Sequence, residues 1–358
     1  MPPRNHKDWL KQPKVEHISS EIYSSHEIYK QEQELIFSKV WIPMCHKSEL
    51  SEAGRFRTTQ IAGQNVIAIN NGDTIKTYLN PGKFSTPAGS MTRVQFLMDE
   101  YTPLHTEVKH GGMVWTTLNS NPTQSVDEWT GGAFDCIADA IDTEEMEVFH
   151  YHKAVIDTNY KLWHDTNSEF YHDFMHYFNR VSGFNDEYFA RKNIPFDNGH
   201  VNVSSFTVNY EEYDGFEDRG ELSFPNLPPN QWYMVDLFPG FNFNLRGSAY
   251  RSDAVTPLGP NTVLIEFRGY GLRKDTEEER QTRIKHHNSI WGPFGRNLHE
   301  DLIGVAGQGT TMREGTESRN ILHGRHENGT IHDEVGMRHY YAEWGRYMEL
   351  NPEMSKAA

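Results

Sequence analysis

The sequence predicts an α+β protein, in which a small all-β module precedes a larger domain with helices flanking an antiparallel sheet. Short strand-like runs separated by turn residues fill the stretch 40–118. Longer strand-like runs recur between residues 201 and 270, and helical patterns are grouped around them. This grouping is typical of α+β folds and argues against an alternating βαβ chain.

Size and composition indicate a globular chain with enough apolar material for a large core. The 358 residues include 20 Phe, 17 Tyr and 8 Trp, and the net charge is −16. A field of that sign repels phosphate backbones and anionic headgroups, so we expect neither a nucleic-acid nor a membrane partner. The sequence contains no apolar run of about 18 residues and begins without a signal-peptide core. We therefore expect a soluble, cytoplasmic protein.

Four consecutive parts are expected along the chain. The first is a helical arm that packs on the last domain, and the second is the β-module, with a less regular, loop-like stretch at 79–112. A linker with one short helix follows, and the larger domain forms the rest. The expected bounds are 1–39, 40–120, 121–146 and 147–358.

The larger domain shows three strand-like and three helical patterns. The strands are expected at 201–208, 232–238 and 263–270, where apolar and β-branched residues run together. The helices are expected at 159–180, 276–288 and 334–348. In the second of these, His286 and His287 stand among charged residues and are expected to be solvated.

A stripe of acids and imidazoles marks the predicted helix 159–180. Projected on a regular helix, Asp165, Glu169, His172 and His176 share one face. Two histidines four residues apart can bind one ion, and a carboxylate one turn earlier can orient a ring through its other nitrogen. The alternative is an amphipathic helix with this face in water. Cations occur only near the two ends of the segment, which favours the metal interpretation.

The two cysteines limit the kinds of metal site. Cys45 and Cys136 cannot form a disulfide framework, a four-cysteine zinc site or a cysteine-ligated cluster. A metal would therefore have to be bound by histidines and carboxylates.

Three groups of residues carry a family resemblance. The first group is 36–41 together with 46–50 and 54–57. The second is 159–162, followed by 169–172 and His176. The third is 292–295, followed by 300–301 and 308–309. In this order they resemble the large (alpha) subunits of Rieske-type non-haem iron aromatic-ring-hydroxylating oxygenases. The resemblance implies a Rieske-like β-domain, and a helix-grip-like catalytic domain with iron beneath its antiparallel sheet.

The resemblance also implies roles for individual residues. His172, His176 and Asp301 would be the ligands of a mononuclear Fe(II), and Glu300 is the competing carboxylate. Glu169 occupies the position of the catalytic bridging acid. Two histidines and one carboxylate leave positions open for dioxygen and substrate, as non-haem Fe(II) oxygenases require.

Two features depart from the family pattern. Three residues, rather than the usual four, separate the histidines, and Thr166 stands where the family often places Asn. A Rieske cluster also needs one Cys-X-His and one Cys-X2-His pair. Residues 81–84, where the first pair belongs, read Pro-Gly-Lys-Phe, and no cysteine lies between Cys45 and Cys136. We therefore expect a vestigial β-module without a [2Fe-2S] cluster.

Three functions remain open. The first is a non-haem Fe(II) oxygenase that acts with dioxygen on an aromatic or other apolar small molecule and draws electrons from the substrate or from a separate redox protein. The second is a non-redox accessory subunit of a cluster-bearing homologue, and the third is a Lewis-acid hydrolase or lyase. The resemblance implies a homotrimer or a multiple of it. The residues considered for an apolar pocket, with core packing as the alternative, are Trp232, Phe238, Phe241, Phe243 and Trp291.

Overall fold

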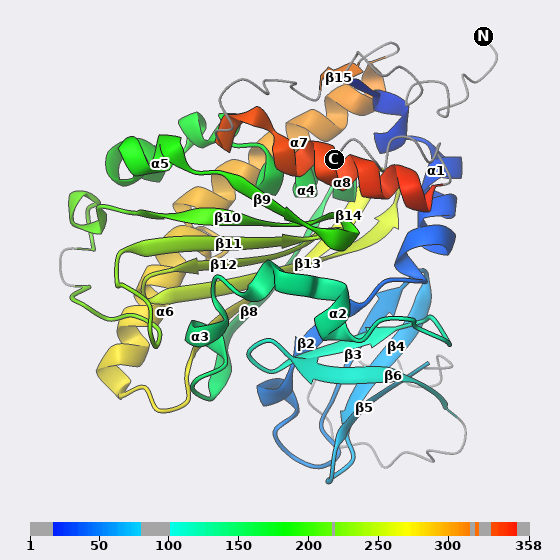
Figure 1. Cartoon of the computed structure of the whole chain (residues 1–358), viewed down its shortest axis with the longest axis horizontal. Helices are drawn as coiled ribbons and strands as arrows, with labels where there is room; N and C mark the ends of the chain where they lie inside the picture. Colours follow the sequence, from blue (N-terminus) through cyan, green and yellow to red (C-terminus); the bar gives the residue numbers. More distant parts are fainter. Residues whose placement is uncertain (1–16, 80–100, 217–218, 316–318, 322–330, 349–358) are drawn as a thin grey trace.

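Two antiparallel sheets form the framework of the protein (Figure 1). The computed structural model describes residues 17–79, 101–216, 219–315, 319–321 and 331–348. The larger sheet has seven strands in the order β8-β14-β13-β12-β11-β10-β9, and the smaller has six in the order β2-β7-β6-β5-β4-β3. The structure is thus of the predicted α+β class.

The six-stranded sheet is built mainly from hairpins. Its strands are β2 (Ile42–His46), β3 (Phe56–Ile61), β4 (Gln64–Asn70), β5 (Ile75–Leu79), β6 (Thr102–Lys109) and β7 (Met113–Thr117). The prediction of loop throughout 79–112 was wrong for β6, which pairs with both β5 and β7. The strand lacks a clear apolar pattern because none of its residues is fully buried. Residues 81–84 lie outside the described residues.

Two short helices, rather than one, connect the sheets. They are α2 (Val126–Thr130) and α3 (Ala138–Ile141). Ser125 begins α2 with a capping box, in which its side chain accepts from the amide of Glu128 and the Glu128 carboxylate accepts from the amide of Ser125.

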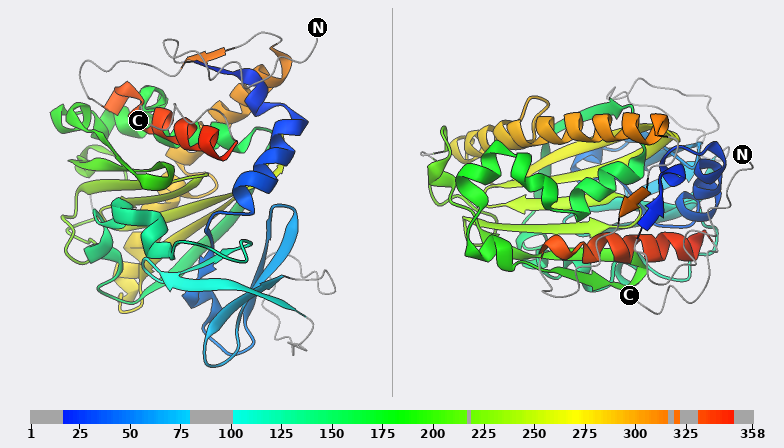
Figure 2. Two further views of the ribbon diagram at one scale, coloured as in Figure 1. Left: turned by 45° about the vertical axis from the view of Figure 1, so that its right-hand side comes forward. Right: turned by 90° about the horizontal axis from the view of Figure 1, so that it is seen from above.

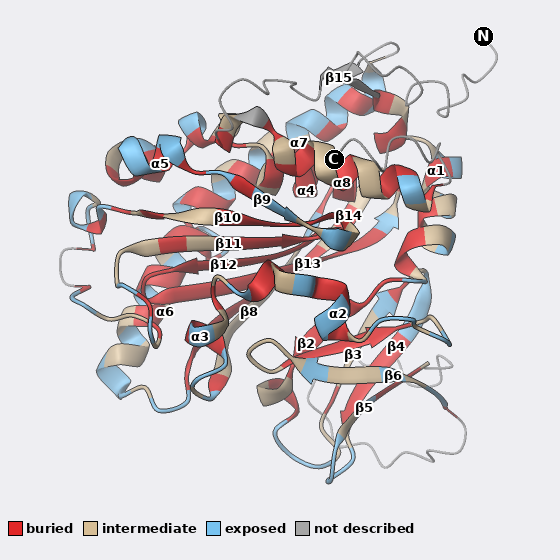
Figure 3. Cartoon of the chain, viewed as in Figure 1, coloured by how far each residue is buried: buried red, intermediate tan, exposed pale blue. Residues whose placement is uncertain are grey.

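The seven-stranded sheet is the centre of the molecule. Its strands are β8 (Met146–Ile156), β9 (Asn193–Phe196), β10 (His200–Thr207), β11 (Gln231–Leu237), β12 (Phe241–Arg246), β13 (Ala249–Gly259) and β14 (Thr262–Leu272). Strands β11 to β14 are buried over almost their whole length (Figure 3). The turn between β12 and β13 needs glycine, because Gly247 has φ +51° and a Cβ there would lie 2.0 Å from the carbonyl oxygen of Pro229.

Helices cover this sheet. They are α4 (Tyr160–Ser168), α5 (Asp186–Ala190), α6 (Glu277–Trp291), α7 (Arg296–Glu314) and α8 (Val335–Tyr347). Seen from above, α7 in orange and α8 in red run over the sheet on either side of green helical segments (Figure 2). No described helix is long and apolar enough to cross a membrane.

The expectation of solvated histidines in α6 was wrong. His286 and His287 are 1% and 0% exposed, because they lie on the side of α6 that faces the sheet. The ring of His287 packs over Gly269 of β14, where a Cβ would approach it to 2.6 Å. The imidazole therefore fills the space that the missing side chain leaves.

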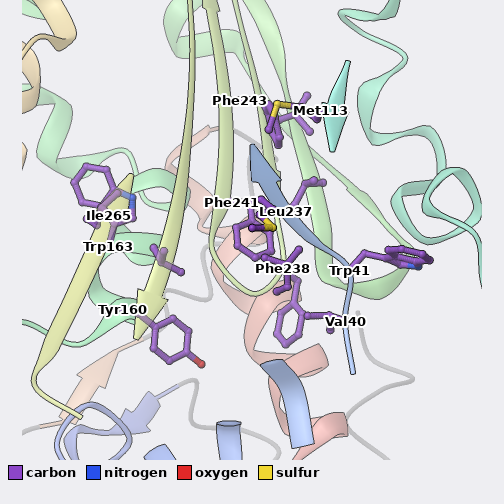
Figure 4. Close-up of a cluster of buried hydrophobic side chains, with 14 of the residues drawn as sticks. Val40, Trp41, Met113, Tyr160, Trp163, Leu237, Phe238, Phe241, Phe243 and Ile265 are labelled. Atoms are coloured by element: carbon purple, nitrogen blue, oxygen red, sulfur yellow. The ribbon is translucent and has the colours of Figure 1, made fainter. Parts of the chain in front are cut away.

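One hydrophobic cluster joins the arm, the small sheet and the large sheet. Figure 4 shows Val40 and Met113 close to Phe238, Phe241 and Phe243 from the large sheet. These three phenylalanines are completely buried in this core. They therefore do not line an apolar pocket, and the alternative of core packing holds for them.

Candidate metal centre

The helix that was predicted to carry the metal site is broken in the middle. Helix α4 ends at Ser168, Glu169 is extended (φ −102°, ψ 144°), and a 3₁₀ segment, Tyr171–Met175, follows. The Glu169 carboxylate causes part of this change, because its Oε2 accepts from the amides of Tyr171 (2.8 Å) and His172 (3.3 Å) and so caps the new turn. The prediction of a continuous helix over 159–180 was therefore wrong.

The break separates Asp165 from the other members of the predicted stripe. Its carboxylate accepts from the hydroxyls of Tyr23 (2.8 Å) and Tyr341 (2.9 Å), and so links α4 to the arm and to α8. Asp165 has a structural role in these contacts.

His172 and His176 nevertheless converge, and they meet Asp301 from the second turn of α7. The Oδ1 atom of Asp301 lies 3.0 Å from Nε2 of His176 and 3.6 Å from Nε2 of His172. The 3₁₀ turn brings the two rings together, and their centroids are 5.1 Å apart.

The Asp301 oxygen is placed to bind a cation. It is buried and has no hydrogen-bond partner among the described residues, although two ring nitrogens lie beside it. Two donor atoms that bind one ion at about 2.1 Å and at a right angle are about 3.0 Å apart. Two imidazoles and one carboxylate also form the donor set of mononuclear iron sites. The arrangement thus suits a divalent metal.

Carboxylates hold the other nitrogen of each ring. Glu169 Oε1 lies 2.6 Å from Nδ1 of His172, and Glu300 Oε2 lies 2.9 Å from Nδ1 of His176. Glu300 also accepts from the amide of Tyr177 (3.3 Å). Both acids can therefore fix a tautomer in which Nε2 is free to bind an ion. Glu300 is on the side of His176 that faces away from Asp301.

Asp173 is a site residue that sequence reasoning missed. Its carboxylate lies within 4.8 Å of the donor atoms of His172 and His176. Its Oδ2 accepts from the hydroxyl of Tyr188 (2.8 Å) and lies 3.6 Å from Nη2 of Arg191, whereas its Oδ1 is 3.7 Å from Nε2 of His172. Asp173 therefore accepts a hydrogen bond from the protein, whereas Asp301 Oδ1 accepts none from a described residue. The only signal in the sequence is its place directly after His172.

The acids make the site strongly negative. Burial alone would lower the pKa of His172, but Glu169, Asp173 and Asp301 outweigh it and raise that pKa to about 10. Burial likewise opposes a rise in the pKa of His176, which Asp301 brings about. This excess of negative charge is what a divalent cation would neutralise.

A small polar cavity adjoins these residues. Its volume is about 30 Å³, which is room for about two waters. Besides His172, His176 and Asp301, its wall includes Thr166, Asn167, Asn244, Arg246, Arg251 and Asn297. Trp232 also lines it, whereas Trp291, the other tryptophan considered for a pocket, is completely buried and is not part of the wall.

The cysteines lie apart from this centre. Cys45 is completely buried in β2, and burial raises the pKa of its thiol. The Sγ of Cys136 contacts the carbonyl of Ala133, and burial raises its pKa to about 12. Among the described residues, no cysteine belongs to a group of three or more possible metal ligands.

A protein-family model matches most of the larger domain. Residues 143–350 match the model described as "Ring hydroxylating alpha subunit (catalytic domain)". The chain is 55% identical to the methanesulfonate monooxygenase hydroxylase subunit alpha of Methylosulfonomonas methylovora, over 99% of this chain and 98% of that protein. It is 32% identical to the 2-aminobenzenesulfonate 2,3-dioxygenase subunit alpha of Alcaligenes sp, over 93% of each chain. The first alignment runs over 405 positions, more than the 358 residues here, so part of that relative has no counterpart in this chain.

Solved structures share the fold. A naphthalene 1,2-dioxygenase from Rhodococcus sp. superposes with a TM-score of 0.74 at 16% identity and covers 96% of both chains. The quaternary ammonium Rieske monooxygenase CntA superposes with a TM-score of 0.73 at 15% identity, covering 95% of this chain and 98% of that one.

Proposed function

Because the chain belongs to the family of ring-hydroxylating oxygenase alpha subunits, and so to the oxygenase-type oxidoreductases, we propose that it hydroxylates a small organosulfonate at a mononuclear iron. The proposed ligands are His172, His176 and Asp301. The observation that carries the metal site is the buried Oδ1 atom of Asp301, which accepts no hydrogen bond from a described residue and lies beside two Nε2 atoms.

Each residue of the centre has a defined task. Bound Fe(II) would supply the one-electron chemistry that lets dioxygen react and would leave positions open for dioxygen and substrate. Glu169 and Glu300 accept the Nδ1 protons of the two histidines and hold the rings in orientation. Asp173 stays with Tyr188 and Arg191, which keeps the 3₁₀ turn in place.

The organosulfonate is proposed from two independent features. The two relatives at 55% and 32% identity are both named for sulfonates. The exposed wall of the cavity is mainly polar and carries guanidinium and amide groups beside Phe170, Trp232 and Met234, which favours a charged molecule over the aromatic or apolar one expected from the sequence.

Electrons would have to come from another protein. Hydroxylation of a C–H bond uses one oxygen atom of dioxygen for the new C–OH group and releases the other as water, which consumes two electrons and two protons. A Rieske cluster requires two thiolates and two imidazoles, whereas the two cysteines of this chain lie in different surroundings, Cys45 buried and Cys136 partly buried. We therefore propose a chain without its own cluster, which is reduced by a separate redox protein or by a cluster-bearing homologous subunit.

Metal content and oxygen consumption test this function. Purified protein reconstituted with Fe(II) should bind one iron per chain, and His172→Ala or His176→Ala should remove most of it while the circular dichroism spectrum is unchanged. His299→Ala is the matched control, because this exposed histidine lies on α7 two residues before Asp301. With methanesulfonate and a reduced redox protein, wild type should consume dioxygen.

Three results would contradict the proposal. Full iron occupancy in both histidine variants would place the metal elsewhere. Turnover that persists without oxygen, or with zinc in place of iron, would favour the Lewis-acid alternative. Activity that appears only after a cluster-bearing homologue with its own iron site is added, and that survives His172→Ala, would make this chain an accessory subunit.

A further inference from the structure

Arg246, in the wall of the cavity, is a buried cation without a polar partner. Its side chain is 8% exposed, and no hydrogen bond or ion pair joins it to any described residue. Its guanidinium carbon instead lies over the rings of Trp291 (5.3 Å), Phe178 (5.5 Å) and Trp232 (5.7 Å). Asp173 and Asp301 line the same cavity and favour the charged form of Arg246, but neither forms an ion pair with it. Burying a charge without a direct partner is unfavourable, so a bound anion would complete the contacts of this guanidinium.

A second arginine stands next to it on the same face of the sheet. In the strand register, Arg251 of β13 lies opposite Asn244 of β12, and Arg246 is two residues beyond Asn244. Arg251 is 3% exposed; its Nη2 is 3.3 Å from Oδ1 of Asp253, and its Nε has no partner among the described residues. Of the two guanidinium groups, only that of Arg251 thus has a carboxylate within ion-pair distance.

The positions of these groups set the orientation of a ligand. Arg246, Arg251 and Asn244 line the same cavity as His172, His176 and Asp301. The four acids around the histidines would repel an anion, whereas the two arginines attract it. A small acid would therefore bind with its charged head at the sheet and its carbon end toward the metal ligands.

We propose that Arg246 and Arg251 form the subsite that binds the anionic head of the substrate and makes the enzyme selective for short sulfonates, phosphonates or carboxylates. The planar fork of arginine presents paired N–H donors that match two oxygens of such a head. Asn244 lies between the arginines, but its Oδ1 is occupied by Nε1 of Trp232 (2.7 Å), so its amide NH₂ is left to donate. This inference rests on the proposed function only for the statement that the ligand is the substrate.

Binding measurements test the subsite without any turnover. We would titrate iron-free protein, and protein loaded with Fe(II) under anaerobic conditions, with methanesulfonate, methylphosphonate, acetate and the neutral isostere dimethyl sulfone by calorimetry. At least one of the acids should bind wild type, and dimethyl sulfone should bind at least 10-fold more weakly. Arg246→Met should weaken binding of that acid by about 100-fold, since it removes one member of a buried charge pair. Arg246→Lys should recover only part of the loss, because an ammonium lacks the fork.

Stability separates a ligand-binding role from a structural one. Arg246→Met should leave the melting temperature of the free protein unchanged or higher, because the side chain makes no hydrogen bond that could be lost. Arg219→Met is the matched control. Arg219 is also buried (7% exposed) and lies over the ring of Tyr210, but it donates to the carbonyl of Pro229 (2.9 Å) and to Asn230 and does not line the cavity. This control should lower the melting temperature and leave the dissociation constant of the acid unchanged.

The inference is wrong if Arg246→Met binds the acids as wild type does, if dimethyl sulfone binds wild type as tightly as methanesulfonate, or if none of the acids binds. The result is independent of the metal. Protein that binds methanesulfonate through Arg246 but never takes up iron would keep this subsite and refute the proposed iron chemistry. Protein that binds iron, but whose acid binding is the same in Arg246→Met as in wild type, would keep the proposed iron site and refute this subsite.

Discussion

At the scale of single residues, the two acids behind the histidines should control metal affinity. Glu169→Gln and Glu300→Gln should each weaken Fe(II) binding by about 10–100-fold, because a neutral amide no longer stabilises the orientation and basicity of the ring it contacts. Competition with a chelator measures this directly. Glu314→Gln, at the exposed end of the same helix as Glu300, is the control and should change nothing.

Glu169→Gln should in addition lower the melting temperature more than Glu300→Gln does. Glu169 accepts from two amides of the 3₁₀ turn, those of Tyr171 and His172, whereas Glu300 accepts from one amide, that of Tyr177. Equal metal affinity in wild type and both variants would show that Glu169 and Glu300 do not contribute to metal binding.

Sequence motifs pointed to the candidate metal ligands, but not to residues whose position in the site depends on the register of the sheet. Spacing and resemblance pointed to His172, His176 and Asp301, which the structure brings within 3.6 Å of one another at Asp301 Oδ1. Arg246 could not be found in this way. Its position facing the cavity follows from the register of β12 and β13. Neither strand was predicted, although Phe241–Arg246 alternates apolar and polar residues.

At the scale of elements, helical periodicity failed to predict the end of α4, where side chains form hydrogen bonds with backbone groups. Thr166 Oγ1 donates to the carbonyl of Leu162 and Asn167 Nδ2 to that of Trp163, and Glu169 then caps a new turn. The 3.6-residue pattern continues through this break and so predicted one helix.

Helix α7 was missed for a different reason. Gly304, Gly307 and Gly309 weaken its helical pattern. Gly309 is required, because a Cβ there would lie 2.7 Å from the carbonyl oxygen of Asp157.

The packing of the N-terminal arm on the larger domain should depend on one buried ion pair. Nζ of Lys161 in α4 lies 2.6 Å from Oε1 of Glu32 in α1 (His26–Glu32), and Nε1 of Trp344 in α8 donates to the same oxygen (2.8 Å). Glu32→Ala should lower the free energy of unfolding by about 3–5 kcal/mol, because it leaves the Lys161 charge buried and unpaired. Denaturant unfolding measures the loss.

A double variant tests this reason. Glu32→Leu combined with Lys161→Met should be more stable than either single variant, since no unpaired charge remains. Glu34→Ala, exposed on the same arm, should change stability by no more than about 0.5 kcal/mol. Strictly additive losses in the double variant would show that the two side chains do not act as a pair.

At the scale of the whole molecule, the electron supply is the property to test. Anaerobic reconstitution with iron and sulfide should leave this chain with mononuclear iron only, without acid-labile sulfide and without the visible bands of an iron–sulfur cluster. The methanesulfonate monooxygenase alpha subunit, treated in parallel, is the comparison. Stoichiometric sulfide in this chain would contradict the proposal that it lacks a cluster. The expected homotrimer, or a multiple of it, remains a prediction that mass photometry can check.

The small sheet is fastened to the large one by more than apolar contact. Arg268 of β14 donates to Glu49 (2.8 Å) and to the carbonyl of Met44 (3.2 Å), and the ring of Trp115 in β7 lies 6.2 Å from that of Phe243. Removal of the small sheet would therefore leave the buried Arg268 guanidinium without its Glu49 partner and would expose part of the core of the large sheet to water. The large domain thus depends on the small sheet for its own stability, whether or not the small sheet carries a cluster.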